Sequence, residues 1–273
     1  MNEDVEQAFF VALFGGITTN KVTCLYRYTS FDSFLKIFDK LEHNMCSLIA
    51  MNDSTETKYF DEYVSKNYGK FLKDMSEESR KNVFSPSIDY HYYITSLMSK
   101  KNFDNLDMWR IYGDNAKGVM IEYEIIPNLL RYPFYLTHVL YETSKDRNGS
   151  VLFMFNLLRH KFDRTKLLRL QHWNVWKHMF KSYEYRNEFE IRLLYVSKDA
   201  SKWVLNKEFN ILMPMKLFSI DQDNPSFPLK IKRVFLGPRM PEKKANEEML
   251  SSLLNENGLS QIEVKHSLIK SYR

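Results

Sequence analysis

The chain of 273 residues is poor in the residues that form linkers, cross-links and membrane spans. Glycine and proline number eight each, so long flexible linkers are not expected. The two cysteines, Cys24 and Cys46, form no C-x-x-C pair and argue against a disulfide-built secreted scaffold. No apolar run reaches the ~18 residues of a membrane span, and the N-terminus is acidic where a secretory signal is basic. We expect a cytoplasmic protein with no membrane segment.

The sequence also lacks the motifs of several well-known sites. It contains no G-x-G-x-x-G, no Walker loop and no G-x-S-x-G, so no recognised phosphate cradle or nucleophile elbow is present. The seven histidines show no zinc-ligand spacing, and no metal is expected. Glu263-x-Lys265 is faintly similar to the E-x-K end of a metal-dependent nuclease, but no suitably spaced aspartate accompanies it. Nuclease activity with Glu263 and Lys265 is therefore one alternative function.

The residues that are present predict one folded α+β domain over 1–273. Hydrophobic residues make up 44%, enough for a sizeable core, and the net charge of +5 permits an anionic ligand without demanding a nucleic acid. Strand character is found at 23–28, 45–51, 90–98, 118–125, 134–141, 188–196, 215–220, 231–237 and 262–269. Helical character is found at 31–42, 105–113, 242–257 and a block at about 150–183. These elements interleave irregularly, which favours α+β over a doubly wound sheet, with the block at 150–183 as a helical insertion.

The stretch KSYEYRNEFEIRL contains two glutamates one residue apart. A strand repeats every two residues, so Glu188, Glu190 and Arg192 are expected on one face and the apolar residues between them on the other. Spacing alone favours a solvated strand face with a Glu190–Arg192 pair. The alternative is a pair of carboxylates that repel one another, which raises one pKa, and that stabilise positive charge in a transition state.

Three further motifs are weak when each is taken alone. Arg27 lies inside a short strand, where an arginine either reaches solvent or clamps an anion. Thr95 and Ser96 carry hydroxyls near the end of an aromatic-rich strand. Trp109 and Tyr112 are three residues apart and are expected on one helix face.

The segment 159–181 is strongly basic. It contains seven Lys or Arg residues and one acid, Asp163. On one helix, Arg159, Lys166 and Lys177 fall nearly in line with Trp173 close by, a combination that suits a nucleic-acid backbone and base stacking. A solvated helix face explains the same charges. The segment therefore supports a second alternative, a non-catalytic module that binds nucleic acid or protein.

The order of the motifs resembles a large, mostly bacterial family catalogued as a domain of unknown function. The matching stretches, LYRYTS, SLIAMNDSTE, ITSLMS, MWRIYGDNAKGVMIEY, YEYRNEFEIRL and RVFLGP, span about 25–238. The M-W-x-x-Y-x-D-x-x-x-G-V signature is the most specific of them. The same order is similar to the arginine–serine–glutamate class of ADP-ribosyltransferases, which implies a split β-sandwich with flanking helices.

That resemblance assigns a role to each residue that matches the transferase pattern. Arg27 is implied to clamp a phosphate or ribose of NAD, and Ser96 to hold the catalytic glutamate by a hydrogen bond. Glu190 is implied to bind the ribose 2′-hydroxyl and to stabilise the oxocarbenium-like state, while Glu188 orients or deprotonates the acceptor. Ile94 stands where the class has the first serine of S-T-S.

The resemblance further implies NAD as the substrate and a protein or nucleic acid as the acceptor of ADP-ribose. Thr95 joins Ser96 in the expected NAD-binding set, and Tyr26, Tyr28 or Tyr112 is expected to stack on nicotinamide. A role as a toxin or antiphage defence effector, with an antidote or regulatory partner, follows from the same resemblance. The sequence favours an enzyme over a binding module and leaves both open.

Overall fold

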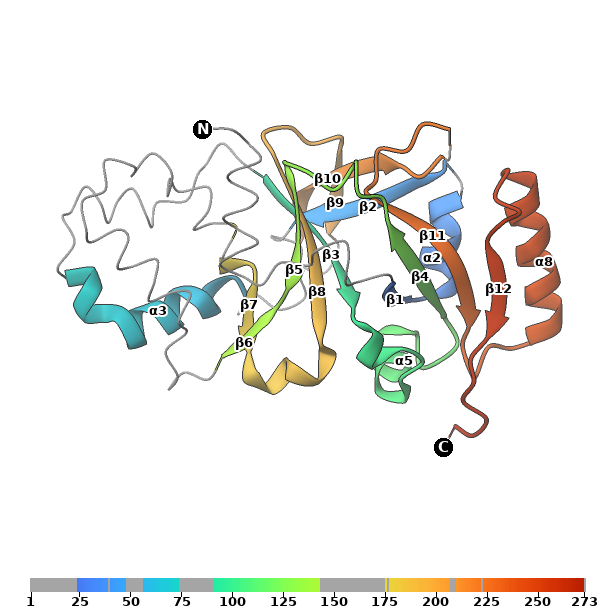
Figure 1. The fold of residues 1–273 in the computed structure, drawn as a ribbon, viewed down its shortest axis with the longest axis horizontal. Coiled ribbons are helices and arrows are strands. Elements are labelled where there is room, and N and C mark those ends of the chain that lie inside the picture. The colour runs from blue at the N-terminus through green and yellow to red at the C-terminus, as the bar shows by residue number, and fades with distance from the viewer. Residues whose placement is uncertain are drawn as a thin grey trace.

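The computed structural model describes residues 24–38, 40–47, 56–73, 91–142, 175, 177–206, 210–221 and 223–272. These residues form an α+β fold around a 10-stranded, mostly antiparallel sheet (Figure 1). Its strands are β1 (Leu25–Thr29), β2 (Glu42–Ser47), β3 (His91–Met98), β4 (Val119–Ile125), β5 (Phe134–His138), β8 (Glu190–Ser197), β9 (Lys202–Asn206), β10 (Ile211–Ser219), β11 (Leu229–Leu236) and β12 (Glu263–His266). The helices are α2 (Phe31–Phe38), α3 (Glu56–Lys73), α5 (Leu106–Tyr112) and α8 (Lys243–Glu256), with 3-10 turns η2 (Lys100–Asn102) and η4 (Tyr183–Glu188).

Strand β3 is the branch point of the sheet. Its C-terminal end pairs with β1, at Tyr26 opposite Met98, and its N-terminal half pairs with β2, at Cys46 opposite Ile94. Along its other edge it pairs with β8, and β8 in turn pairs with β5. The sheet therefore divides at β3 into an arm β1-β4-β11-β12 and an arm β2-β10-β9. The β11–β12 pair is parallel, and the other strand pairs of this sheet are antiparallel.

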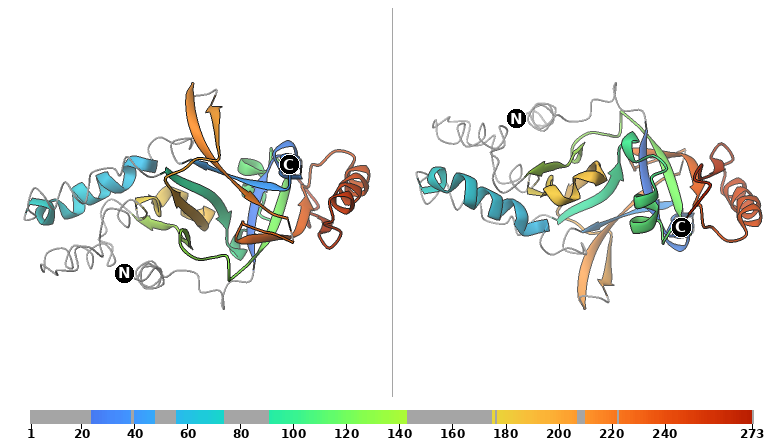
Figure 2. Two further views of the ribbon diagram at one scale, coloured as in Figure 1. Left: turned by 90° about the horizontal axis from the view of Figure 1, so that it is seen from above. Right: turned by 90° about the horizontal axis from the view of Figure 1, so that it is seen from below.

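Two short strands and one long helix lie beside this sheet. Strands β6 (Leu140–Glu142) and β7 (Phe180–Ser182) form a separate parallel pair. Helix α3 extends from that end of the molecule (Figure 1) and packs on β7, where the Phe60 and Phe180 rings lie 4.5 Å apart. Hairpin β9–β10 projects from the body of the sheet (Figure 2).

The two faces of the arm that begins at β1 bury different residues. On the main-core face, Leu25 and Leu97 pack with Phe34 and Phe38 of α2 and with Leu250 of α8. On the opposite face, hereafter the α5 face, alternate residues of the same strands pack under helix α5. The α5 face is made of Tyr26, Tyr28, Met98, Met120 and Phe235, covered by Met108 and Trp109 of α5. A shift of one residue along β1 or β3 therefore moves a side chain from one layer to the other.

Local signals explain where helix α5 begins and ends. The side chain of Asn105 caps its first turn by accepting hydrogen bonds from the backbone N–H groups of Asp107 and Met108. The helix ends at Gly113, the predicted stop. At Gly118, a Cβ atom would lie 2.1 Å from the backbone oxygen of Thr29, so only glycine fits beside β1. Of these positions, Gly118 belongs to the M-W-x-x-Y-x-D-x-x-x-G-V signature, and its close approach to β1 explains the glycine there.

Most predicted elements are present, and several differ. The strands expected at 90–98, 118–125 and 231–237 are confirmed as β3, β4 and β11. Strand β9 was not predicted. Most of the expected helical block, and most of the basic segment 159–181, lies outside the described residues. Within the block, residues 180–182 form strand β7 instead of helix, because they pair with β6.

Among the helices that the structure describes, none is long and apolar enough to cross a membrane.

Candidate functional site

The E-F-E stretch lies at the junction of η4 and β8. Glu188 ends the 3-10 turn η4, and strand β8 begins at Glu190. Between them Phe189 adopts the left-handed conformation with a φ of 43°, a strained backbone state for a bulky residue. The prediction that Glu188 and Glu190 alternate on one strand is therefore wrong. The turn, and not the strand period, brings the two carboxylates together.

Two cations bind the two carboxylates. Arg192 donates from Nε to Glu190 Oε1 at 2.7 Å and from Nη2 to Glu190 Oε2 at 3.1 Å. Lys181 Nζ lies 2.7 Å from Glu188 Oε2 and 3.4 Å from Glu190 Oε2, and so bridges both acids. We call Lys181, Glu188, Glu190 and Arg192 the glutamate cluster. The Glu190–Arg192 pair was predicted from the strand period and is confirmed.

The glutamate cluster is buried, against the expectation of a solvated face. Glu190 is 3% exposed, Arg192 1% and Glu188 8%. Burial alone raises the pKa of Glu190, but the charges of Arg192 and Lys181 outweigh burial, and the pKa is lowered. Glu190 is therefore held ionised inside the protein. The expectation failed because η4, β7 and α5 form a second layer over this end of β8, which the period of one strand does not reveal.

Two predicted site residues join the glutamate cluster. Ser96 lies opposite Arg192 in the β3–β8 register, and its side chain contributes to the lowered pKa of Glu190. Tyr112, in the last turn of α5, donates its hydroxyl proton to Glu188 Oε1 at 2.5 Å. Burial, followed by the hydrogen bond to Glu188, raises the pKa of Tyr112, so the hydroxyl stays protonated and remains a donor. Ser96 is exposed, so the cluster borders solvent on the Ser96 side.

Four exposed aromatic side chains lie on η4, at Phe189 and at the end of α5, and one of them, Tyr112, contacts Glu188. Tyr112, Tyr183, Tyr185 and Phe189 all expose 37–44% of their surface. Lys181 Nζ lies 4.6 Å from the centre of the Tyr185 ring, which connects the rim directly to the buried charges. We call these four residues the aromatic rim. Exposed rings beside buried carboxylates are suited to a flat, partly cationic ring of a ligand.

The remaining predicted residues lie elsewhere. Register places Tyr26 of β1 opposite Met98 of β3, and Met98 opposite Glu190 of β8, so these three side chains lie on the same face of the sheet. Arg27 is the next residue along β1, and its side chain therefore points to the opposite face. Arg27 Nη1 donates to His43 Nε2 at 3.2 Å, and Thr95 Oγ1 lies 3.1 Å from the same nitrogen. Arg27 and Thr95 therefore lie on the main-core face, and the structure does not bring them together with the glutamate cluster.

Arg27, His43 and Thr95 form a second polar group, hereafter the Arg27 cluster. Because Arg27 can only donate, His43 Nε2 accepts, and the proton of the neutral ring is on Nδ1, which is buried. Burial and the Arg27 charge lower the pKa of His43 well below its ordinary value. Among the described residues, neither His43 Nδ1 nor the buried hydroxyl of nearby Tyr123 has a hydrogen-bond partner.

Tyr28 has a structural position on the α5 face. Its hydroxyl donates to the backbone oxygen of Asn102 at 2.7 Å and accepts from the backbone nitrogen of Asn105 at 2.9 Å. Its ring packs edge-on against Trp109 with centroids 4.8 Å apart. Tyr28 thereby fixes η2 and the start of α5. Its predicted contact with NAD stays a prediction.

Two members of the site were not predicted as such. Lys181 belongs to the basic segment 159–181, but its side chain is 8% exposed and is engaged by the glutamates. Tyr141 accepts the backbone N–H of Glu190 at 2.8 Å and so fixes the start of β8. The contacts of Lys181 with the glutamates depend on the turn between β7 and β8, which no sequence pattern revealed. The only sequence signal for Lys181 as a site residue was therefore its position at the start of KSYEYRNEFEIRL.

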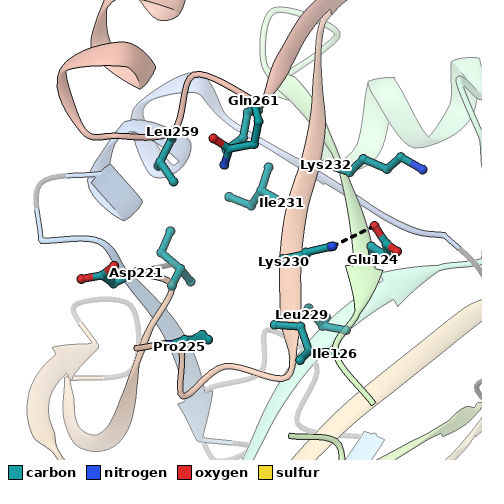
Figure 3. A pocket seen from close by; sticks show the side chains of 12 residues that line it. Glu124, Ile126, Asp221, Pro225, Leu229, Lys230, Ile231, Lys232, Leu259 and Gln261 are labelled. Carbon is teal, nitrogen blue, oxygen red and sulfur yellow. Dashed lines mark ion pairs between the residues drawn. The ribbon is translucent and has the colours of Figure 1, made fainter. Parts of the chain in front are cut away.

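A cavity of about 510 Å³ lies beside η2. Ser99, Lys100 and Lys101 form one wall, and Glu122, His138 and Arg233 contribute to the others. A smaller cavity of about 280 Å³ lies between β11 and the loop after α8 (Figure 3), with Leu229, Ile231 and Leu259 in its apolar lining. At its edge Lys230 pairs with Glu124 at 3.3 Å (Figure 3).

The nuclease alternative concerns the other end of the sheet. Glu263 and Lys265 lie on β12 and pair with one another at 2.9 Å on the surface. Among the described residues, no group of three or more His, Cys, Asp or Glu residues is arranged to hold a metal ion.

Comparison with known proteins finds no matching family model, no matching curated protein and no matching solved structure.

Proposed function

We propose that the chain is an ADP-ribosyltransferase-like enzyme that cleaves NAD at the nicotinamide–ribose bond, with the glutamate cluster as its reacting centre. The observation that carries this proposal is a buried pair of carboxylates, neutralised by Arg192 and Lys181, beneath an exposed aromatic rim. Nicotinamide is a flat cationic ring in NAD, and the rim offers rings on which it can stack. Glu188 offers a carboxylate, already paired with Lys181, at the place where the ribose becomes positive.

The two glutamates have different parts in this reaction. Glu188 reaches the rim through Tyr112, so it is the carboxylate placed to contact the ribose. As the C–N bond breaks, its electron pair leaves with nicotinamide, and Glu188 stabilises the oxocarbenium-like ribose. The acceptor then bonds to the anomeric carbon and gives its proton to Glu188. Glu190, enclosed by Arg192 and Ser96, is a positioning residue that fixes the turn and the negative charge behind Glu188.

The acceptor and the biological setting belong to the same proposal. A protein or nucleic acid receives the ADP-ribose, and a role as a toxin or antiphage effector in the bacterial cytoplasm, with an antidote or regulatory partner, follows from the resemblance of motif order. Arg27 lies on the opposite face of the sheet from the glutamate cluster. Its predicted role as a clamp on a phosphate or ribose of NAD stays a prediction.

Nicotinamide release from NAD by the full chain tests this proposal. Glu188→Gln keeps the shape of the side chain and removes its charge, and we expect it to lower the rate about 100-fold or more. Glu124→Gln is the matched control, since Glu124 is an exposed glutamate that pairs with Lys230 in another part of the sheet. The proposal fails if the wild-type chain releases no nicotinamide with water, protein or nucleic acid as acceptor, or if Glu188→Gln is as active as the control.

A further inference from the structure

We propose that the cavity beside η2 is a site for a phosphate or diphosphate ester, and that it holds the phosphate-bearing part of the ligand whose ribose reaches Glu188. The claim that the ribose of the same ligand reaches Glu188 rests on the proposed function. The cavity, its charge and its connection to the E-F-E turn are independent of any reaction.

The cavity carries a surplus of positive charge. Lys100, Lys101 and Arg233 line it together with one acid, Glu122. Arg233 binds that acid through two hydrogen bonds of 2.7 and 2.8 Å, and Glu122 is fully buried. The one carboxylate is thus neutralised by the one arginine. The charges of the two lysines remain for a ligand.

The lysines have no acidic partner within the described part of the chain. No carboxylate there lies within ion-pair distance of Lys100 or Lys101, whereas Lys36, Lys181, Lys230 and Lys265 are all paired. Lys100 and Lys101 are both exposed, and two adjacent lysines at the wall of a cavity attract an anion. The lysines also follow Ser99, whose hydroxyl accepts the backbone N–H of Lys101 and holds the turn in shape.

The wall of the cavity is attached directly to the turn that carries the glutamates. The backbone N–H of Ser99 donates to the backbone oxygen of Phe189 at 3.3 Å. Asn102 donates from its side chain to the backbone oxygen atoms of Asn187 and Glu188. Lys101 Nζ lies 4.4 Å from the centre of the Phe189 ring, so one lysine lines the cavity and also touches the aromatic rim.

These contacts indicate which kind of ligand could occupy the aromatic rim and the cavity beside η2 at the same time. A molecule that stacks a flat ring on the rim and extends past Phe189 meets Lys101 and the cationic cavity. A nucleotide, in which a flat base is joined through ribose to a phosphate, has this arrangement of a ring, a sugar and an anion. The volume of about 510 Å³ is within the size range of small-molecule sites.

Binding of ADP and of inorganic pyrophosphate to the full chain, measured by calorimetry, tests the site without any turnover. We expect both to bind wild type, and adenosine, which lacks phosphate, to bind about tenfold more weakly or worse. Lys100→Gln and Lys101→Gln are each expected to weaken ADP about tenfold, the cost of one charge-assisted hydrogen bond. Lys230→Gln is the matched control, because Lys230 lines the other cavity (Figure 3).

The outcomes separate this inference from the proposed function. If ADP binds and depends on Lys100 and Lys101, but NAD is not cleaved, the anion site stands and the reaction does not. The inference is overturned if neither ADP nor pyrophosphate binds at millimolar concentration, if the lysine variants bind like Lys230→Gln, or if adenosine binds as tightly as ADP.

Discussion

The molecule buries two polar groups close to strand β3, one on each face, and they are built differently. The glutamate cluster contains two carboxylates and two cations in mutual contact. The Arg27 cluster contains one cation whose partners, His43 and Thr95, are neutral. The first borders an exposed aromatic rim and solvent at Ser96. In the second, His43 and Thr95 are buried, with His43 stacked on Phe227 of the main hydrophobic core, while Arg27 is partly buried.

The difference between the clusters indicates where function is to be expected. Burying matched charges costs desolvation energy that the ion pairs only partly return, so hydrophobic residues of the same volume would often stabilise the fold as well. A protein that nonetheless holds Glu190 ionised at the end of a strand, with Glu188 beside it and solvent nearby, has a candidate functional site there. In the Arg27 cluster His43 and Thr95 are buried and Arg27 is partly buried, and the His43 Nδ1 and Tyr123 hydroxyl groups, which have no partner among the described residues, reduce stability.

The largest expected effect is the loss of a cation from the glutamate cluster. Arg192→Met leaves Glu190 buried without its main partner and should lower the free energy of unfolding by about 3–5 kcal/mol, measured by urea denaturation. The double variant with Glu190→Gln removes the uncompensated charge and should lie closer to wild type. If Arg192→Met lowers the free energy of unfolding by less than ~1 kcal/mol, Arg192 is not the cation that compensates the buried charge of Glu190.

The two clusters should also differ in the pH range where they affect stability. The folded-state pKa of His43 is lowered by burial and by Arg27, so below pH 6.5 the unfolded chain binds more protons and stability falls as pH falls. The effect of His43 is at most ~1.4 kcal/mol per pH unit, or about 2 kcal/mol between pH 6.5 and 5. The lowered pKa of Glu190 affects stability at lower pH. Its contribution to the free energy of unfolding is present above pH 4.5 and is lost as the pH falls below that value.

His43→Phe keeps a ring that stacks on Phe227 and removes the titration. Unfolding measured at several pH values should give a flatter profile between pH 6.5 and 5 than in wild type, while the loss below pH 4.5 persists. An unchanged slope would assign that pH dependence to another group, and buried His178, whose pKa is also lowered by burial, Lys177 and Arg192, is the first to examine.

The sequence predicted much of the sheet and part of the site, because these depend on local periodicity. The Glu190–Arg192 pair follows from a period of two, and the end of α5 follows from Gly113. The same period already implies that Thr95 and Ser96, which are adjacent on β3, face opposite sides. Their predicted roles in binding NAD stay predictions.

The parts that were not predicted depend on contacts between distant segments. Lys181 meets the glutamates because β7 runs beside β6, and η4 then turns the chain back to β8. Which face Arg27 occupies depends on its pairing through Tyr26 and Met98, which no short motif encodes. The burial of Glu190 likewise requires the covering layer of η4, β7 and α5. Spacing therefore identified chemically interesting residues, but register and layering decided which of them lie together.

The smallest expected effect is also the most direct comparison of the two clusters. Arg27→Met applies to the Arg27 cluster the substitution made at Arg192, and it removes a cation that no described carboxylate balances. The free energy of unfolding should change by less than ~1 kcal/mol in either direction, because lost hydrogen bonds are offset by relief of desolvation. Nicotinamide release should stay within about threefold of wild type, which is less than ~1 kcal/mol of transition-state stabilisation. A hundredfold loss of activity with an intact fold would instead assign Arg27 the clamp role that the family resemblance implies, and the two clusters would then serve one ligand from both sides of β3.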